Sequence, residues 1–333
     1  MIRVAVSAML LAIAACTGSS MDASNDPFDG YRSFHFEGEH PIRAVATVGM
    51  VADALRQLGG ERVEVTQMMG SGVDPHMYKP TRDDVQLILD ADIIFCVGLM
   101  LEGKMLDTLA RIGRNQPVVA VGERIAETGV LRSSENALVY DPHIWMDVRL
   151  WKEAVGAVAA ALGEFDPEGV AEYEGRAAAY LEELELLHDY AARALASIPP
   201  DRRILITSHD AFHYLGRAYG LEVRGIQGLS TESEAGLQRI NALVDLIVLQ
   251  GVPAVFVESS VSPRNVEALV EGARSRGHSL RIGGELFSDA MGPSGTYEGT
   301  YLGMLDHNIT TVTRALGGEA PRAGLHGRLS SGR

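Results

Sequence analysis

The sequence predicts an α/β protein of two lobes, each with a parallel sheet and flanking helices, joined by one long rigid α-helix. Two observations predict this fold. Short β-rich runs alternate with longer amphipathic runs, first over residues 41–165 and again over residues 199–318. Between the two series, residues 166–198 carry apolar side chains at spacings of three and four, which is typical of one helical face.

The first series predicts one α/β lobe built from strand–helix–strand units. Gly59 and Gly60 end its first helix. Thr81 and the polar residues that follow it mark the start of the second helix. Because strands alternate with helices, the sheet is expected to be parallel. Strands are expected at 43–48, 62–69, 91–98 and 116–122, and helices at 51–60 and 83–91.

The second series predicts a similar lobe. Gly220 ends its first helix, and a Ser-Pro pair at 262–263 starts another, since proline is favoured in the first helical turn. Strands are expected at 202–208, 221–227, 253–260 and 279–287, and helices at 211–220, 236–251, 262–277 and 300–316.

The segment between the lobes predicts a stiff rod. Asp166-Pro167 marks its start and Pro199-Pro200 its end. About thirty helical residues rising ~1.5 Å each give a length of roughly 45 Å. One such helix differs from the flexible strands of a hinge, and it predicts limited motion of the lobes.

Both ends of the chain are expected to lie outside the lobes. Arg3 and the apolar run that ends at Ala15 fit a secretory signal peptide, residues 1–15, which is too short to span a membrane as a mature helix. The run continues into Cys16 in a pattern that resembles a bacterial lipobox, which predicts lipidation of Cys16; an ordinary signal peptide with an incidental cysteine is the alternative. Residues 16–40 are expected to form a flexible tether, and residues 319–333 a disordered tail.

Composition excludes some classes of function. The formal net charge of −15 argues against a nucleic-acid partner, which would need clustered Lys and Arg. Cys16 and Cys96 are the two cysteines, so lipidation of Cys16 leaves none to form an internal disulfide with Cys96. No segment after the signal reaches 18 apolar residues, so no transmembrane helix is expected.

Four polar residues follow predicted strands or close the first lobe. The tripeptide Asp-Pro-His occurs twice and supplies His76 and His143; His209 follows the strand at 202–208, and Asp289 the strand at 279–287. Ligands of open α/β sheets bind beyond the carboxyl ends of the strands, so these side chains are expected to meet between the lobes.

Three imidazoles and one carboxylate suit a divalent metal. Zinc takes four such ligands in a tetrahedron, and manganese accepts the same set but favours more oxygen. Four protein ligands leave no position for a catalytic water, which predicts a protein that holds Zn²⁺ or Mn²⁺ and is not an enzyme.

The surroundings of the four residues give further expectations. Each ligating imidazole should donate its other N–H to a carboxylate or carbonyl, and the candidate carboxylates are Asp74, Asp141, Asp210 and Glu258. His213 lies one helical turn after His209 and is either a ligand or a packing residue. The remaining histidines are expected not to bind metal, with His188 at the surface: His35, His40, His188, His278, His307 and His326.

Six blocks of sequence resemble the zinc/manganese solute-binding lipoproteins of bacterial ABC transporters (cluster A-I), in their TroA-like form. The resemblance covers roughly residues 41–316. It implies a metal between two lobes with His76, His143, His209 and Asp289 as ligands, an ABC permease and its ATPase as partners, attachment to the membrane by a lipid, and a monomer. The blocks are GSGVDPHMYKPTRDDV, LMLEGKM, DPHIWMDV, TSHDAFHYLGRAYGLEVRGIQGLSTESEAG, FVESSVSPRNVEAL and IGGELFSDAMGPSGTYEGTYLGMLDHNI.

Two features bear on which metal is carried. His209 stands where some members of that family have Glu, and those members are associated with manganese. The stretch before His143 lacks the long His-rich loop of dedicated zinc scavengers. Zinc should outcompete manganese by raw affinity, so the metal carried would depend on which metal is available. The choice between the two therefore stays open.

Three other functions stay open from the sequence. A secreted metallohydrolase would need an open coordination position and a base near the metal. A chelate-binding receptor for haem or a siderophore would need a wide pocket in place of four converging ligands. An adhesin or structural lipoprotein would not need a working site at all.

Overall fold

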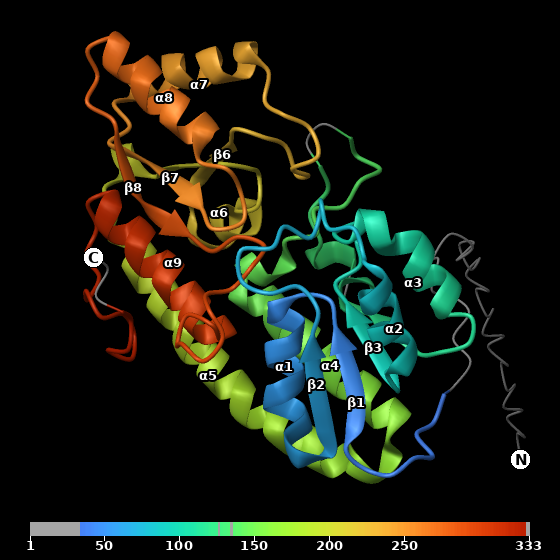
Figure 1. Ribbon diagram of the computed structural model, residues 1–333. Helices are drawn as coiled ribbons and strands as arrows, with labels where there is room; N and C mark the ends of the chain where they lie inside the picture. Colours follow the sequence, from blue (N-terminus) through green and yellow to red (C-terminus); the bar gives the residue numbers. More distant parts are fainter. Residues whose placement is uncertain (1–33, 126, 134–135, 331–333) are drawn as a thin grey trace, which may run out of the picture.

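The computed structural model describes residues 34–125, 127–133 and 136–330. The expected signal peptide, Cys16 and most of the tether lie outside these ranges. Two lobes are joined along one side by the long helix α5, Val170–Ala196, with α9, Tyr301–Ala315, beside it (Figure 1). The two-lobed α/β fold predicted from the sequence is confirmed.

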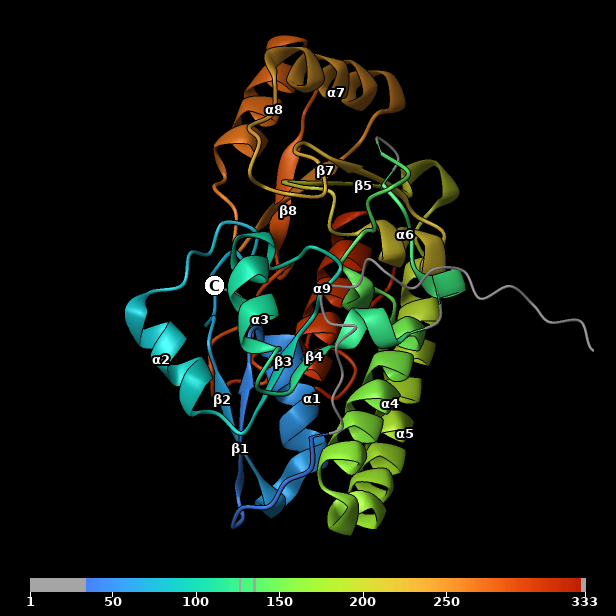
Figure 2. The same ribbon diagram turned by 90° about the vertical axis from the view of Figure 1, so that its right-hand side faces the viewer.

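The first lobe contains a four-stranded sheet of order β2-β1-β3-β4, in which all pairs are parallel. Helix α1 packs with α4 and α5, while α2 and α3 lie on the other face of the sheet (Figures 1 and 2). The strands and helices are β1 Ile42–Ala46, α1 Gly49–Gly59, β2 Val63–Gln67, α2 Arg82–Asp90, β3 Ile93–Cys96, α3 Leu106–Ile112, β4 Val118–Ala120 and α4 Val148–Phe165.

Helices α3 and α4 are not among the elements expected from the sequence. The buried residues of α4 recur at spacings of three and four, as in α5, although the run VGAVAAALG also places small apolar residues between them. The side chain of Asp147 caps the helix by accepting a hydrogen bond from the Arg149 N–H at 3.0 Å. Because α4 packs along α5, the connection between the lobes is thickened into a helix pair at the first lobe (Figure 2).

Helix α5 follows the predicted apolar stripe. Its buried residues recur at spacings of three and four, and the helix contacts α1 and α4 in the first lobe and α6 and α9 in the second. It therefore forms part of the core of both lobes. The buried residues of this stripe include Tyr173, Ala177, Tyr180, Leu184, Leu187, Ala191 and Leu195.

The second lobe is built from two parallel strand pairs, β5-β6 and β7-β8, with β5 and β7 side by side. A separate apolar cluster lies between these strands and helices α7 and α8, with Ile206, Ile247, Val255 and Leu269 fully buried. The strands and helices are β5 Ile204–Thr207, α6 His213–Tyr219, β6 Glu222–Gly225, α7 Leu237–Gln250, β7 Ala254–Glu258, α8 Arg264–Ser275 and β8 Arg281–Leu286, followed by α9.

Two segments that were expected to be flexible make tertiary contacts. At the end of the expected tether, the Phe36 N–H donates to the Phe165 carbonyl at 2.7 Å. In the expected disordered tail, the Leu325 N–H donates to the Asp306 carboxylate at 2.9 Å and the Ser330 N–H donates to Glu298 at 2.9 Å. The expectation of disorder is therefore wrong for residues 319–330, because these carboxylates on and beside α9 need donors that the tail supplies.

Candidate metal site

The four candidate ligands come from four separate loops. His76 lies in the loop after β2, His143 directly before the 3-10 turn Ile144–Met146, His209 just after β5, and Asp289 after β8. Each loop lies at the carboxyl end of a sheet strand or at the start of α4, where the lobes face one another.

The loop that carries Asp289 is fixed from both lobes. Asn308 of α9 accepts from the Phe287 N–H at 2.9 Å and donates to the Phe287 carbonyl at 2.7 Å. The Trp145 indole N–H donates to the Ser288 carbonyl at 2.9 Å. Trp145 therefore ties the segment of His143 to the loop of Asp289. This role of Trp145 could not be recognised from the sequence, although the residue stands two positions after His143.

The structure brings the four side chains to one point. The Nε2 atom of His143 lies 3.4 Å from Nε2 of His76 and 3.3 Å from Nε2 of His209. The Asp289 carboxylate lies 3.3 Å from Nε2 of His143 through Oδ1, and through Oδ2 3.2 Å from Nε2 of His209 and 3.8 Å from Nε2 of His76. All four residues are at most 4% exposed.

These separations match those of ligands around one small cation. A tetrahedron with metal–ligand bonds of ~2.1 Å has edges of about 3.4 Å. The observed Nε2–Nε2 and nitrogen–oxygen distances cluster around this value, and one donor atom from each residue lies within 4.8 Å of the others.

Two carboxylates determine which ring nitrogen of two of these histidines faces the centre. Asp141 Oδ1 lies 2.7 Å from Nδ1 of His143, and Glu258 Oε2 lies 2.5 Å from Nδ1 of His209. An acceptor at Nδ1 keeps a proton on that nitrogen, so in the neutral ring Nε2 presents its lone pair to the centre. Lone pairs and a buried carboxylate that meet at one point are stabilised by a cation.

In the metal-free cluster, protons on the imidazoles of His143 and His209 balance the negative charge of the nearby carboxylates. Burial disfavours a charged His143, but the Asp141 and Asp289 carboxylates outweigh burial and raise its pKa to about 9. For His209, Asp289 and Glu258 likewise outweigh burial and raise the pKa well above the usual value. Burial would raise the pKa of Asp289, but His209 and His143 hold it well below the usual value. An arriving metal must therefore displace protons from these imidazoles.

His76 has a different environment. Burial lowers the pKa of its imidazole to about 3, so the ring is neutral at physiological pH. No carboxylate or carbonyl in the described ranges accepts a hydrogen bond from its Nδ1. The backbone N–H of His76 instead donates to Asp74 Oδ1 at 2.9 Å.

The four expected supporting carboxylates separate into two pairs. Asp141 and Glu258 contact a ring nitrogen of a cluster histidine, as described above. Asp74 reaches only the backbone of His76, and Asp210 Oδ1 accepts from the Gly225 N–H at 2.6 Å. The expectation that Asp74 and Asp210 support a ligating imidazole directly differs from the structure, because backbone amides engage both carboxylates.

The other histidines lie outside the cluster. His213 is partly exposed, 3.7 Å from Asp141 Oδ2 and 3.4 Å from Asp210 Oδ1. His188, expected at the surface, is buried with Nδ1 3.0 Å from the Tyr219 hydroxyl; the surface expectation was wrong, because the helix face beside Asp189 also packs against α6. The remaining histidines contact residues away from the four ligands: His35, His40, His278, His307 and His326.

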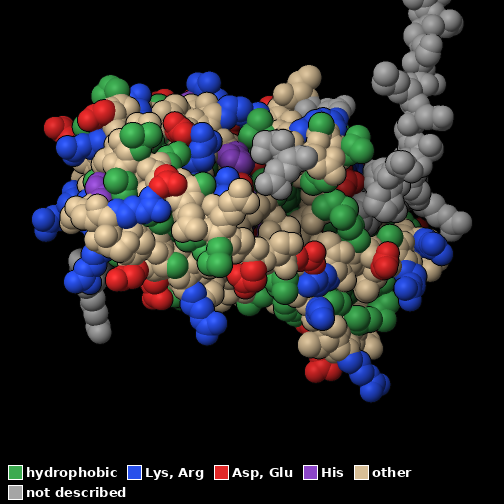
Figure 3. Space-filling model, turned by 90° about the horizontal axis from the view of Figure 1, so that it is seen from above, with side chains coloured by type: hydrophobic (Ala, Val, Ile, Leu, Met, Phe, Trp, Pro, Cys, Tyr) green, Lys and Arg blue, Asp and Glu red, His purple; other side chains and the backbone are tan. Residues whose placement is uncertain are grey.

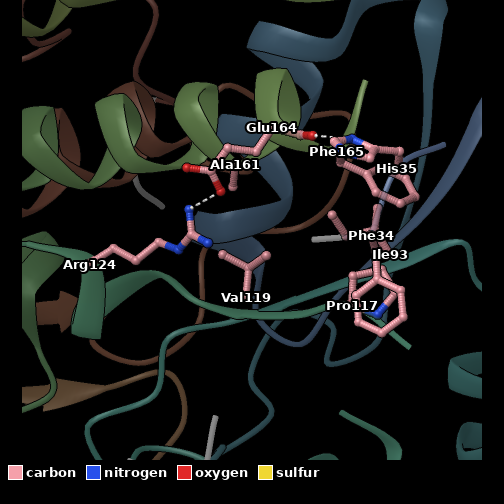
Figure 4. Close-up of a pocket in the computed structure, with 9 residues that line it drawn as sticks. All are labelled: Phe34, His35, Ile93, Pro117, Val119, Arg124, Ala161, Glu164 and Phe165. Atoms are coloured by element: carbon pink, nitrogen blue, oxygen red, sulfur yellow. Dashed lines mark hydrogen bonds and ion pairs between the residues drawn. The ribbon is translucent and has the colours of Figure 1, made fainter. Parts of the chain in front are cut away.

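A cavity of about 380 Å³ lies away from the four ligands, at the end of the first sheet where β3 and β4 begin (Figure 4). Its charged side chains pair with each other, since Arg124 Nη1 donates to Glu164 Oε2 at 3.0 Å. No group of metal-binding side chains converges there among the described residues. Its lining residues are Phe34, His35, Ile93, Pro117, Val119, Arg124, Ala161, Glu164 and Phe165.

Known proteins share this sequence and fold. The chain is 42% identical to the manganese-binding lipoprotein MntA of Bacillus subtilis, with 93% of this chain and 98% of MntA covered. It is also 42% identical to the zinc-binding protein TroA of Treponema pallidum, with 95% and 99% covered. The solved structure of that periplasmic zinc-binding TroA superposes with a TM-score of 0.81 at 44% identity, covering 83% of this chain and 99% of TroA.

A sequence model of a whole protein family gives the same assignment. The family described as zinc-uptake complex component A, periplasmic (ZnuA) matches residues 44–315, which include both lobes, the connecting helix and all four clustered side chains. The chain belongs to the ZnuA family of metal-binding components of uptake complexes.

Proposed function

We propose that this protein binds one Zn²⁺ or Mn²⁺ ion through His76, His143, His209 and Asp289, outside the cytoplasm, and delivers it to an ABC importer. The observation that carries the proposal is the convergence of three Nε2 atoms and a carboxylate at tetrahedral spacing in a buried site. Membership of a family of uptake components supports a carrier, and relatives that bind manganese or zinc support this class of ion.

The geometry disfavours two of the other functions that the sequence left open, the metallohydrolase and the chelate-binding receptor. Four protein ligands in a closed site provide no open coordination position, which a catalytic metal normally keeps. Donor atoms within 4.8 Å of one another also leave no room for a haem or a siderophore. Acidic and basic side chains are intermingled on the face in Figure 3, and with a net charge of −15 this gives no support for a nucleic-acid partner.

Elemental analysis of the protein purified without added metal tests the proposal, followed by competition between Zn²⁺ and Mn²⁺. We expect one bound ion per chain, with Zn²⁺ displacing Mn²⁺ because imidazole-rich sites follow the Irving–Williams order. The variant His143→Ala should bind the ion too weakly to retain it through purification. A native protein that takes up neither metal, or a His143→Ala variant that retains it fully, would contradict the proposal.

We propose further that Cys16 is lipidated and that the protein acts as a membrane-attached monomer. The lipobox-like sequence before Cys16 and the lipoprotein MntA among the relatives support attachment. No helix in the described part of the chain is both long and apolar enough to cross a membrane. Mass spectrometry of the mature N-terminus, with Cys16→Ser as the control, tests lipidation, and light scattering tests the monomer.

A further inference from the structure

A loop of the second lobe, residues 228–235, reaches the first lobe beside His76. The Thr231 hydroxyl donates to Asp74 Oδ2 at 2.5 Å, and Glu232 Oε1 lies 3.2 Å from Lys104 Nζ. The same Lys104 Nζ lies 3.4 Å from the sulfur of Met77, the residue that follows His76. These contacts join the two lobes next to one ligand.

Asp74 links the Thr231 contact from the second lobe to the ligand His76. One of its oxygens accepts the His76 N–H at 2.9 Å, and the other accepts the Thr231 hydroxyl. His76 lacks the carboxylate that stands behind His143 and His209, so Asp74 is the polar group that orients its segment. If Thr231 moves away, the Asp74 carboxylate loses the partner from the second lobe that holds it.

The two ends of this contact are themselves supported. On the second lobe, the Gln227 amide donates to the Ser233 carbonyl at 3.0 Å and to the Thr231 carbonyl at 3.4 Å. On the first lobe, Lys104 follows a loop in which Leu99 and Met100 have positive φ angles of 52° and 69°. Residues other than glycine rarely adopt this strained conformation, which often occurs at functional sites.

A buried carboxylate maintains that strained loop. Glu102 is 1% exposed and accepts hydrogen bonds from the Thr47 hydroxyl at 2.7 Å, the Val97 N–H at 2.9 Å and the Gly98 N–H at 3.1 Å. These bonds tie the side chain of Glu102, two residues before Lys104, to the backbone at the start of the loop, Val97 and Gly98. The backbone that carries Lys104 is therefore held in a fixed position.

We propose that Thr231, Asp74, Lys104 and Glu232 form a cross-lobe clasp that positions His76 and sets the rate at which the metal leaves. This inference rests on the proposed function. The Thr231–Asp74 bond carries most of the effect, since it involves a charged acceptor and is partly buried. The Lys104–Glu232 pair contributes less, because the Glu232 side chain is 52% exposed and solvent screens the pair.

Release of Zn²⁺ from the full-length chain into excess chelator, followed by stopped-flow spectroscopy, tests the clasp. In Thr231→Val, which removes the hydroxyl at similar volume, we expect dissociation to be about 10-fold faster, as for loss of a hydrogen bond to a charged group. Thr231→Ser keeps the donor and should release metal within about twofold of the native rate. Lys104→Gln should accelerate release by about twofold.

Glu234→Gln is the matched control, since Glu234 is exposed in the same loop and should leave the rate unchanged. Asp74→Ala removes the partner of both the Thr231 hydroxyl and the His76 N–H, so adding Thr231→Val to it should not accelerate release further. Native protein that fails to bind Zn²⁺ would overturn the proposed function. Native protein that binds Zn²⁺, together with a Thr231→Val variant that releases it at the native rate, would overturn the clasp alone.

Discussion

The imidazoles of His143 and His209 differ from that of His76 in the hydrogen-bond partner of the ring nitrogen Nδ1. The first two are fully buried and each has a carboxylate at Nδ1, Asp141 at 2.7 Å and Glu258 at 2.5 Å. His76 has no such partner among the described residues, and its segment is oriented through Asp74. The comparison indicates that His143, His209 and Asp289 form a fixed part of the site and that His76 is its adjustable part.

Removing one ligand from each part should give the largest difference. Structural zinc sites bind with roughly 10–16 kcal/mol, so one of four ligands contributes about 3 kcal/mol, or about 100-fold in affinity. We expect about this loss in His76→Ala, and at least about 1000-fold in Asp289→Ala, which also removes the only carboxylate of the set. Chelator competition measures both affinities. Equal losses would show that the two parts do not differ.

Removing the supporting carboxylates should have the next largest effect. Asp141→Asn and Glu258→Gln should each lower Zn²⁺ affinity by about 10- to 100-fold, because a neutral amide replaces the charged acceptor at Nδ1 and fixes the tautomer and orientation of the ring less firmly. Asp210→Asn is the matched control and should stay within about twofold, since Asp210 does not touch a cluster imidazole. An equal loss in Asp210→Asn would mean that overall charge, and not contact, causes the effect.

The pH dependence of binding should separate the same two parts. The pKa of His143 in the metal-free fold is about 9, above its unfolded value of 6.5. Its protonation therefore stabilises the metal-free protein fully below pH 6.5, and this stabilisation is lost as the pH rises through 9. Metal binding removes the proton, so affinity should rise by about tenfold per pH unit for each proton released in this window.

Titration calorimetry across pH 6.5–9 measures this dependence. The pKa of His76 is about 3, so His76 releases no proton in this range. His76→Ala should therefore keep the native slope, whereas His143→Ala should reduce it. A native affinity that stays flat over the window would contradict the proton balance described for the cluster.

The smallest expected effect concerns how far the support of His143 extends. The Tyr214 hydroxyl donates to the Asp141 carbonyl at 2.7 Å and accepts the Leu131 N–H at 2.9 Å. Tyr214→Phe should lower the free energy of unfolding by about 1–2 kcal/mol, because two buried backbone groups lose their partner. Metal affinity should change by less than about threefold, as measured by competition. A larger loss of metal affinity would show that Tyr214 also belongs to the fixed part of the site.

The sequence was sufficient to predict the lobes, the connecting helix and the residues that meet between them. Strand ends can be located from the pattern, and parallel strands present their carboxyl ends at one edge of a sheet. The repeated Asp-Pro-His added a local signal for two of the residues. Helix α4 was missed although its buried residues recur at the spacings of three and four that indicate a helix, so its pattern was available in the sequence.

Contacts made by single side chains could not be predicted in the same way. Asp141 and Asp210 both stand close in sequence to a cluster histidine, yet only Asp141 contacts a ring nitrogen of one. The side chain of Glu258 accepts from His209, 49 positions away, and this contact exists only because β5 lies beside β7 in the fold. The ordering of residues 319–330 likewise depends on Asp306 and Glu298, which cannot be recognised as acceptors for the tail before the fold is known.

Helix α5 has a consequence for how an importer could distinguish full from empty carriers. Because the same rod forms part of the core of both lobes, we expect that the two halves do not swing far apart and that the outline of the molecule is nearly the same with and without cargo. A transporter then has little change of shape to detect. If the Thr231–Asp74 contact holds the loaded site closed, recognition of the loaded carrier would depend on how firmly this contact resists deformation.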